Sequence, residues 1–311
     1  MNKLIGVIDE AGAFRPREDG VEGFGIGAIL FREEETNLLV RAAKAIGSRV
    51  GKDDFKYKHV KNDAEASAIF IHALQANSLK VFGFYSSGAG VAEKVARYNK
   101  AAALYGRVKL ETGNSSETEV LLDMFLGFAI GAIACHALVT GYSADLYWDR
   151  RNDMDLMKIL VDKHVAKLKG NPRLVGAEKT IRFVGQTTAK LNAVARLAGV
   201  LAGDLRLYFE SHSEKLWKYL DEDGLKAPTD PYRTNNLAAS SRLVHTMTEP
   251  LADPKPHDCS GSKVMLQGYY KRFLKHPETN CKLISFCDPK GRMGILEIEH
   301  GRRWHIRQSA D

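Results

Sequence analysis

The sequence predicts an α/β protein in which a mixed α+β sheet is flanked by helices. Short apolar runs of β-type residues alternate along the chain with longer segments whose apolar residues have helical spacing. The first two runs, residues 4–12 and 23–31, are joined by a polar loop containing Gly and Pro, which is typical of a hairpin. The chain has 311 residues, enough for one large domain or two smaller ones with a sizeable core.

The same two patterns, short runs of β-type residues and apolar residues at helical spacing, predict the remaining strands and helices. After the hairpin, strands are expected at 79–85, 144–149, 180–184, 283–286 and 294–298. Helices are expected at 33–48, 62–74, 116–139, 154–169 and 191–209, with further helical segments up to Tyr105. We expect a domain at 1–210 and a helical and basic C-terminal extension at 211–311, which contains a Pro-rich break at 250–256.

Charge and cysteine content restrict the setting. The formal charge is +7, and the segment from Lys255 onward has 11 basic and 6 acidic residues, a net +5, which fits a nucleic-acid partner. The most apolar stretch, 124–139, is shorter than the roughly 20 residues of a membrane-spanning helix, so a buried core helix and no membrane are expected. Four cysteines do not suggest a disulfide framework, which indicates a reducing, cytoplasmic setting.

Acidic residues recur where strands end. Asp9 ends the first predicted strand, Asp149 ends the strand at 144–149, and Asp204 lies in the helix after the last strand of the first domain. Asp54 belongs to a short segment of mixed acids, bases and aromatics. Carboxylates that converge at strand ends can hold Mg²⁺ or Mn²⁺, and two such ions can support phosphodiester cleavage. Because strand side chains alternate, Glu10 should face away from Asp9 and act structurally.

Four short motifs resemble those of a bacterial family called domain of unknown function 3800. Ile8-Asp9-Glu10-Ala11-Gly12 resembles its Asp-Glu-Ser-Gly opening, and Asp54-Phe55-Lys56-Tyr57 resembles its Glu-x-Lys motif. Tyr147-Trp148-Asp149-Arg150-Arg151 resembles a strand that ends in Asp followed by Arg, and residues 197–206 resemble a helix reading roughly Leu-Ala-Asp-x-x-Ala-Gly. The resemblance covers about residues 4 to 210 and implies a ribonuclease-H-like central mixed sheet with a metal site.

The resemblance also assigns roles, with some departures from the family pattern. It implies that Asp9, Asp54 and Asp149 are catalytic metal ligands, with Asp204 as the candidate for a fourth, and that Lys56 contacts phosphate or water, although Lys56 could equally be a surface lysine. Ala11 stands where the family has Ser, Asp54 where it has Glu, and Gly199 where the most natural register has Asp. Asp204 is five residues further on, about 140° around the helix. Either Asp204 substitutes from another angle, or the fourth acid is missing.

Basic residues mark candidate nucleic-acid contacts. Arg150 and Arg151 could meet phosphates, or could form a solvated turn with an ion pair to Asp153. Arg302 and Arg303 precede Trp304, a pattern that suits backbone contact with stacking but also fits a plain basic terminus.

A zinc site is the weaker possibility in the tail. Its imaginable ligands lack the paired Cys spacing that would make it a strong prediction: His257, Cys259, Cys281, Cys287 and His300. Elsewhere the chain has no Gly-Lys-Ser/Thr phosphate loop and no Gly-x-Ser-x-Gly elbow. Gly25 and Gly27 lie inside a predicted strand and are therefore no dinucleotide fingerprint.

The sequence therefore favours a divalent-metal-dependent nuclease on a ribonuclease-H-like fold, with Mg²⁺ or Mn²⁺ as cofactor and DNA or RNA as partner. The alternative is a non-catalytic ribonuclease-H-like module that binds nucleic acid or a protein, for instance in a mobile-element or phage-defence system. A third reading is an enzyme that acts on a small phosphorylated molecule.

Overall fold

A computed structural model describes residues 3–12, 23–74, 80–86, 96, 114–149, 154–169, 175–223, 281–287, 293–299 and 303–308. Its strands are β1 (Lys3–Ala11), β2 (Phe24–Arg32), β3 (Lys80–Ser86), β4 (Ser143–Trp148), β5 (Ile181–Gln186), β6 (Cys281–Cys287), β7 (Met293–Glu299) and β8 (Arg303–Gln308). Its helices are α1 (Thr36–Val50), α2 (Tyr57–Val60), α3 (Ala64–Leu74), α5 (Asn114–Thr140), α6 (Met154–Leu168) and α7 (Asn192–Asp223). Two short 3₁₀ turns are η1 (Glu33–Glu35) and η2 (Ala177–Lys179).

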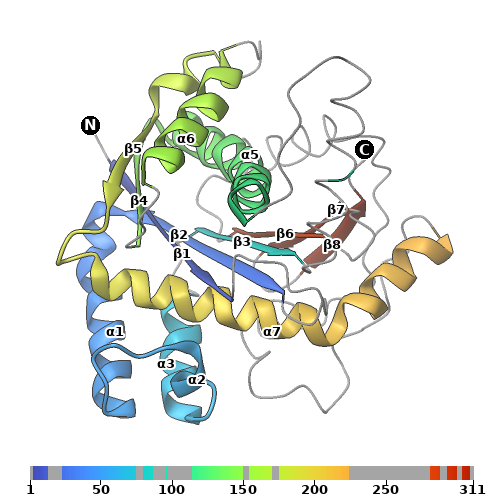
Figure 1. Ribbon diagram of the computed structural model, residues 1–311. Coiled ribbons are helices and arrows are strands. Elements are labelled where there is room, and N and C mark those ends of the chain that lie inside the picture. The colour runs from blue at the N-terminus through green and yellow to red at the C-terminus, as the bar shows by residue number, and fades with distance from the viewer. Residues whose placement is uncertain are drawn as a thin grey trace.

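The strands form one sheet in the order β5-β4-β1-β2-β3-β6-β7-β8 (Figure 1). Neighbours from β1 to β3 are antiparallel, whereas β4 runs parallel to β1 and β5 runs parallel to β4. β6 is parallel to β3, and the last two strands are antiparallel additions. The mixed sheet confirms the predicted α/β class, and the β1–β2 pairing is the predicted hairpin.

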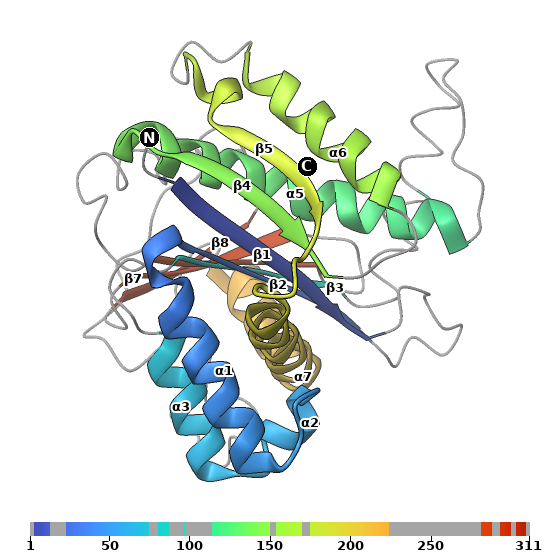
Figure 2. The same ribbon diagram turned by 90° about the vertical axis from the view of Figure 1, so that its left-hand side faces the viewer.

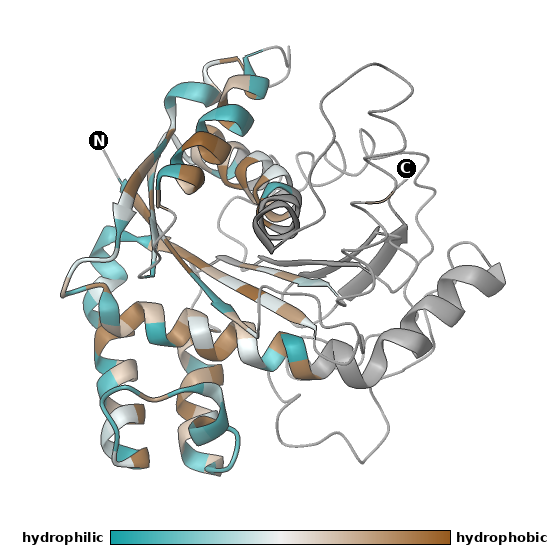
Figure 3. Ribbon diagram, in the orientation of Figure 1, coloured by the Kyte–Doolittle hydropathy of each residue, from teal (hydrophilic) through white to brown (hydrophobic). Residues whose placement is uncertain are grey.

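Helices cover both faces of the sheet. α1, α2, α3 and α7 lie on one face, and α5 and α6 lie on the other (Figures 1 and 2). Alternation along β1 divides its side chains between the two layers, so that Ile5 and Val7 join the core under α1, α3 and α7. Leu4 and Ile8 face the opposite way, into the core under α5 and α6. In the coloured part of the chain, brown apolar segments run along β1 and β2, and the helices alternate brown and teal (Figure 3).

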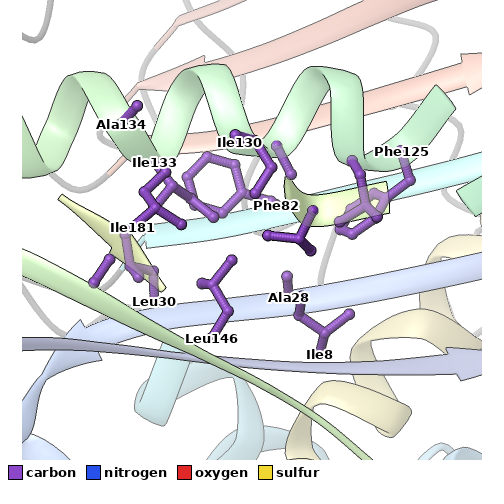
Figure 4. Close-up of a cluster of buried hydrophobic side chains, with 14 of the residues drawn as sticks. Ile8, Ala28, Leu30, Phe82, Phe125, Ile130, Ile133, Ala134, Leu146 and Ile181 are labelled. Carbon is purple, nitrogen blue, oxygen red and sulfur yellow. The ribbon is translucent and has the colours of Figure 1, made fainter. Parts of the chain in front are cut away.

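The core under α5 explains the most apolar stretch of the sequence. Phe125, Ile130 and Ile133 of α5 are buried against β-strand residues such as Phe82 and Leu146 (Figure 4). Burying a side chain of this size contributes about 1.5–3 kcal/mol. The prediction of a core helix is thus confirmed, and among the described residues no helix is both long and apolar enough to cross a membrane.

Glycines in β2 let α7 approach the sheet closely. A Cβ at Gly27 would lie 2.5 Å from the carbonyl oxygen of Ala198, and a Cβ at Gly25 would collide with the carbonyl of Ala202. The same face of β2 therefore seats the backbone of α7 directly. This approach brings α7 to the end of β1, where the candidate site lies.

Several expectations lie outside the described residues, namely the helical segments before Tyr105 and the Pro-rich break at 250–256. The predicted strands at 283–286 and 294–298 correspond to β6 and β7. The segment that begins at Arg303, for which the sequence left open a nucleic-acid contact or a plain basic terminus, forms the additional strand β8. These three strands extend the sheet that the first 210 residues begin.

Candidate functional site

Asp9 lies near the end of β1, on the face covered by α7. It shares that face with Ile5 and Val7, as the alternation predicts. A Cβ built at Gly199 would collide with Asp9 Oδ2, so the carboxylate lies directly against the backbone of α7. The other oxygen, Oδ1, accepts a 2.8 Å hydrogen bond from the backbone N–H of Glu10. The carboxylate is thus held between its own strand and the helix.

The surroundings of Asp9 disfavour its negative charge. Its pKa is raised to about 8, first by burial and then by the nearby carboxylates of Glu10 and Asp149. The hydrogen bond from Glu10 N–H and the positive charge of Lys56 oppose this rise. At neutral pH the site therefore favours either a proton or a cation at Asp9.

Asp149 is brought beside Asp9 by the parallel pairing of β1 with β4. Ile8 is in register with Trp148, and the next N–H, that of Asp149, donates to Ile8 O at 2.9 Å. The Thr187 hydroxyl lies 3.3 Å from Asp149 Oδ1 and 2.8 Å from Asn192 Oδ1. These two carboxylates, one from each neighbouring strand end, are the pair predicted from the sequence. Thr187 and Asn192 are contacts that no motif indicated.

Lys56 reaches the same region from the loop before α2. The residues on either side of it are anchored: Phe55 is buried in the core, and a Cβ at Gly203 of α7 would lie 2.5 Å from Tyr57 Cβ. Lys56 itself is exposed and lowers the pKa of Asp9 through its charge. The loop therefore presents a cation to the carboxylate pair, with aromatic residues fixing it to the fold.

Glu10 faces the other layer, as predicted. Its Oε2 accepts a 2.5 Å hydrogen bond from the indole N–H of Trp148, which is fully buried. Trp148 in turn packs edge-on against Phe125, with ring centroids 6.1 Å apart. Glu10 thus satisfies a buried donor from the other layer, while its charge still raises the pKa of Asp9.

Asp54 has a different environment from the strand-end pair. Its side chain is 82% exposed and lies 3.9 Å from Nε of Arg196, a residue of α7. Arg196 precedes Gly199 by about one helical turn, so this exposed contact places Asp54 near the point where Asp9 meets the helix. Arg196 was not predicted; an isolated arginine in an apolar helix gave only a weak signal.

Asp204 is buried within α7, with 3% of its surface exposed. The residue of α7 that lies on Asp9 is Gly199, in the register that the sequence favoured. In the described part of the chain, no group of three or more His, Cys, Asp or Glu side chains is arranged to hold a metal ion. Roles for Asp54 and Asp204 as ligands therefore stay predictions.

Most of the arginines predicted to contact nucleic acid lie outside the described residues. Arg150, Arg151 and Arg302 lie outside the described residues, and for Arg303 only the backbone, in β8, is described. Of the imagined zinc ligands, His257, Cys259 and His300 are also outside, whereas Cys281 and Cys287 stand at opposite ends of β6. The nucleic-acid contacts and the zinc site therefore stay predictions from the sequence.

Comparisons with known proteins add no assignment. No protein-family model matches the chain, and no curated protein matches it either.

Proposed function

We propose that the chain is a divalent-metal-dependent phosphodiesterase acting on nucleic acid, on a ribonuclease-H-like fold. The observation that carries the proposal is the pairing of Asp9 with Asp149 at adjacent ends of β1 and β4, one of them buried against α7. Two carboxylates held together in this way favour a cation between them, because like charges otherwise repel. The four sequence motifs support the same conclusion.

The strand arrangement agrees with the fold that the resemblance implies. Three antiparallel strands at the start of the chain are followed by two parallel strands that add to the other side of β1. The resemblance to domain of unknown function 3800 implies a central mixed sheet of this kind, flanked by helices. Among these five strands β1 is central, and Asp9 and Asp149 lie at the adjacent ends of β1 and its parallel neighbour β4.

The donor set suits one hard cation. Mg²⁺ keeps several waters and is commonly bound through one or two carboxylates together with substrate phosphates. Asp9 and Asp149 would supply those carboxylates, and oxygen-only ligation favours Mg²⁺ or Mn²⁺ over zinc. When bound, the ion would neutralise the pair and stabilise negative charge that develops on the phosphodiester. If Asp54 or Asp204 also contributes, a second ion becomes feasible.

The protein's own residues would position the substrate around that pair. Lys56 carries a positive charge toward Asp9 and would attract a phosphate oxygen. Gly199 lets the helix cover one side of Asp9, and the Thr187 hydroxyl contacts Asp149 from the end of β5. The sparse cysteines suit the reducing cytoplasm in which such an enzyme would work.

Hydrolysis assays test this proposal. Labelled single- and double-stranded DNA and RNA should be cleaved with Mg²⁺ or Mn²⁺, and cleavage should vanish in Asp9→Asn and Asp149→Asn. Asp162→Asn, which changes an exposed acid of α6 on the other layer, should cleave like the wild type. Cleavage that persists in both site variants would refute the assignment.

One observation favours a second candidate, a non-catalytic nucleic-acid-binding module. The α7 position that lies on Asp9 is Gly199, which offers no carboxylate. A protein of this kind would bind oligonucleotides and cleave none of them under any divalent metal. The same assays therefore separate the two functions.

A further inference from the structure

A basic segment lies beside the carboxylate pair. Residues 52–61, which include α2, contain four lysines and two aspartates. Lys52, Lys56 and Lys58 are exposed, and His59 is half-buried among them. Of the two aspartates, Asp54 faces Arg196 of α7. The segment therefore offers solvent a mainly positive surface next to Asp9.

Hydrogen bonding fixes the tautomer of His59. The backbone N–H of Lys56 donates to His59 Nδ1 at 3.0 Å, so Nδ1 must carry a lone pair. In the neutral ring the proton is then on Nε2. Burial and the charges of Lys52, Lys58 and Lys56 lower the pKa of His59, while Asp54 opposes them, and this favours the neutral ring near pH 7.

Two donors consequently meet, and the described residues place no acceptor that both of them share. Lys52 Nζ lies 3.5 Å from His59 Nε2, and both atoms carry hydrogens in this tautomer. Neither can accept from the other. An oxygen anion placed between them could accept a hydrogen bond from each, and the exposed Lys56 and Lys58 would add attraction.

We propose that Lys52 and His59 form a phosphate subsite that holds a backbone phosphate of a nucleic-acid strand beside the Asp9 and Asp149 pair. The choice of ligand rests on the proposed function, because Lys56 links the two places: its charge acts on Asp9, and its backbone N–H bonds His59. A strand that places one phosphodiester at the carboxylates would thus place another phosphate of its backbone on Lys52 and His59.

The subsite has a defined anchorage in the fold. The backbone N–H of Lys52 donates to Gly47 O of α1 at 2.9 Å, and this bond does not depend on the side chain. Phe55, which lies between Lys52 and His59 in the sequence, is buried in the core. Lys52→Ala should therefore remove a donor without disturbing the loop.

Binding of a labelled 12-nucleotide single strand, measured by fluorescence anisotropy without divalent metal, tests the subsite. Lys52→Ala should weaken binding about tenfold. The slope of log K against log salt should become shallower by about 0.7, the value for one lost single-strand phosphate contact. His59→Leu should weaken binding similarly, while His59→Gln, which keeps a donor at the outer position, should retain most of it. Lys158→Ala on α6, an exposed lysine of the other layer, should bind like the wild type.

A local readout separates this subsite from general charge loss. In protein with ¹⁵N-labelled histidine, the oligonucleotide should shift the Nε2 resonance of His59, and inorganic phosphate should do so only at much higher concentration. Equal shifts with both at equal concentration would mean a site for free phosphate and would overturn the strand assignment. Unchanged affinity and salt slope in Lys52→Ala and His59→Leu would overturn the subsite itself. If binding follows these expectations but no cleavage is found, the subsite stands and only the proposed hydrolysis fails.

Discussion

The Asp9 carboxylate lies against the backbone of α7 at Gly199, where even a single added methyl group has no space. A strand end and a helix residue that are 190 positions apart in the chain thus define one wall of the candidate site. This contact makes Gly199 a positioning residue, since its lack of a side chain determines where the Asp9 oxygens lie.

Gly199→Ala should displace Asp9. The new Cβ would meet Oδ2, and overpacking of this kind costs about 1–3 kcal/mol of stability. In an Asp9→Ala background the clash is absent, so the same change should be neutral or stabilising by up to about 1 kcal/mol through helix propensity. Denaturant unfolding of the four proteins measures the difference. Equal costs in both backgrounds would show that Asp9 is not what the methyl group meets.

The raised pKa of Asp9 predicts a stability change with pH. Asp9 has a pKa of about 8 in the folded protein and about 3.8 when unfolded, so the folded state holds this proton more tightly. The resulting stabilisation is complete below about pH 4 and is lost as the pH rises toward 8. Asp9→Asn should be more stable than the wild type at pH 8, with a difference that shrinks toward pH 5. A difference independent of pH would contradict the burial of an ionisable Asp9.

Glu10→Gln separates the two acids of the opening motif. Glutamine keeps an acceptor for the Trp148 indole N–H, so the variant should fold with an unchanged tryptophan fluorescence spectrum. Removing the Glu10 charge should lower the pKa of Asp9, because that charge raises it. Cleavage should survive, in contrast to Asp9→Asn. Loss of cleavage with an intact fold would place Glu10 in the catalytic machinery.

A separate ion cluster near the start of β4 should make the free energy of unfolding fall at acid pH. Asp145 is buried and meets Lys3 Nζ at 2.5 Å and Arg182 Nη2 at 2.8 Å. Burial raises its pKa, but hydrogen bonds from Arg182 and Lys3 outweigh burial and leave the pKa below its usual range.

The contribution of Asp145 should therefore be present above about pH 4 and be lost as the pH falls further. Asp145→Asn should cost about 1–3 kcal/mol at pH 7, measured by urea unfolding, and the cost should diminish in acid. Asp155→Asn, an exposed acid of α6, serves as the control and should change little. An equal loss in both variants would mean that the cluster contributes nothing specific.

The sequence was sufficient to predict those elements whose local residue pattern matches their burial in the fold. Two short apolar runs joined by a polar loop predicted the β1–β2 hairpin, and acids at the strand ends drew attention to Asp9 and Asp149. β8 was missed because its alternation of arginine and histidine with Trp304 and Ile306 is also the pattern of a basic tail. Pairing with β7 makes it a strand, and such a partner is not visible locally.

Contacts between distant segments were the least predictable part of the site. The motif register suggested that Gly199 stood in place of an acid, but only the approach of α7 to β2 puts it on Asp9. The Asp54 contact with Arg196 joins a loop to a helix and depends on the same packing. The contact between Lys52 and His59 could not be predicted either, because it depends on the hydrogen bond from the backbone N–H of Lys56 that orients the imidazole.

The most direct test of the central claim is a Mn²⁺ titration followed by electron paramagnetic resonance at pH 8, in which free Mn²⁺ gives the signal. The wild type should bind Mn²⁺, both Asp9→Asn and Asp149→Asn should lose that binding, and Asp162→Asn should keep it. Undiminished binding of Mn²⁺ by both Asp9→Asn and Asp149→Asn would contradict a metal site at the ends of β1 and β4.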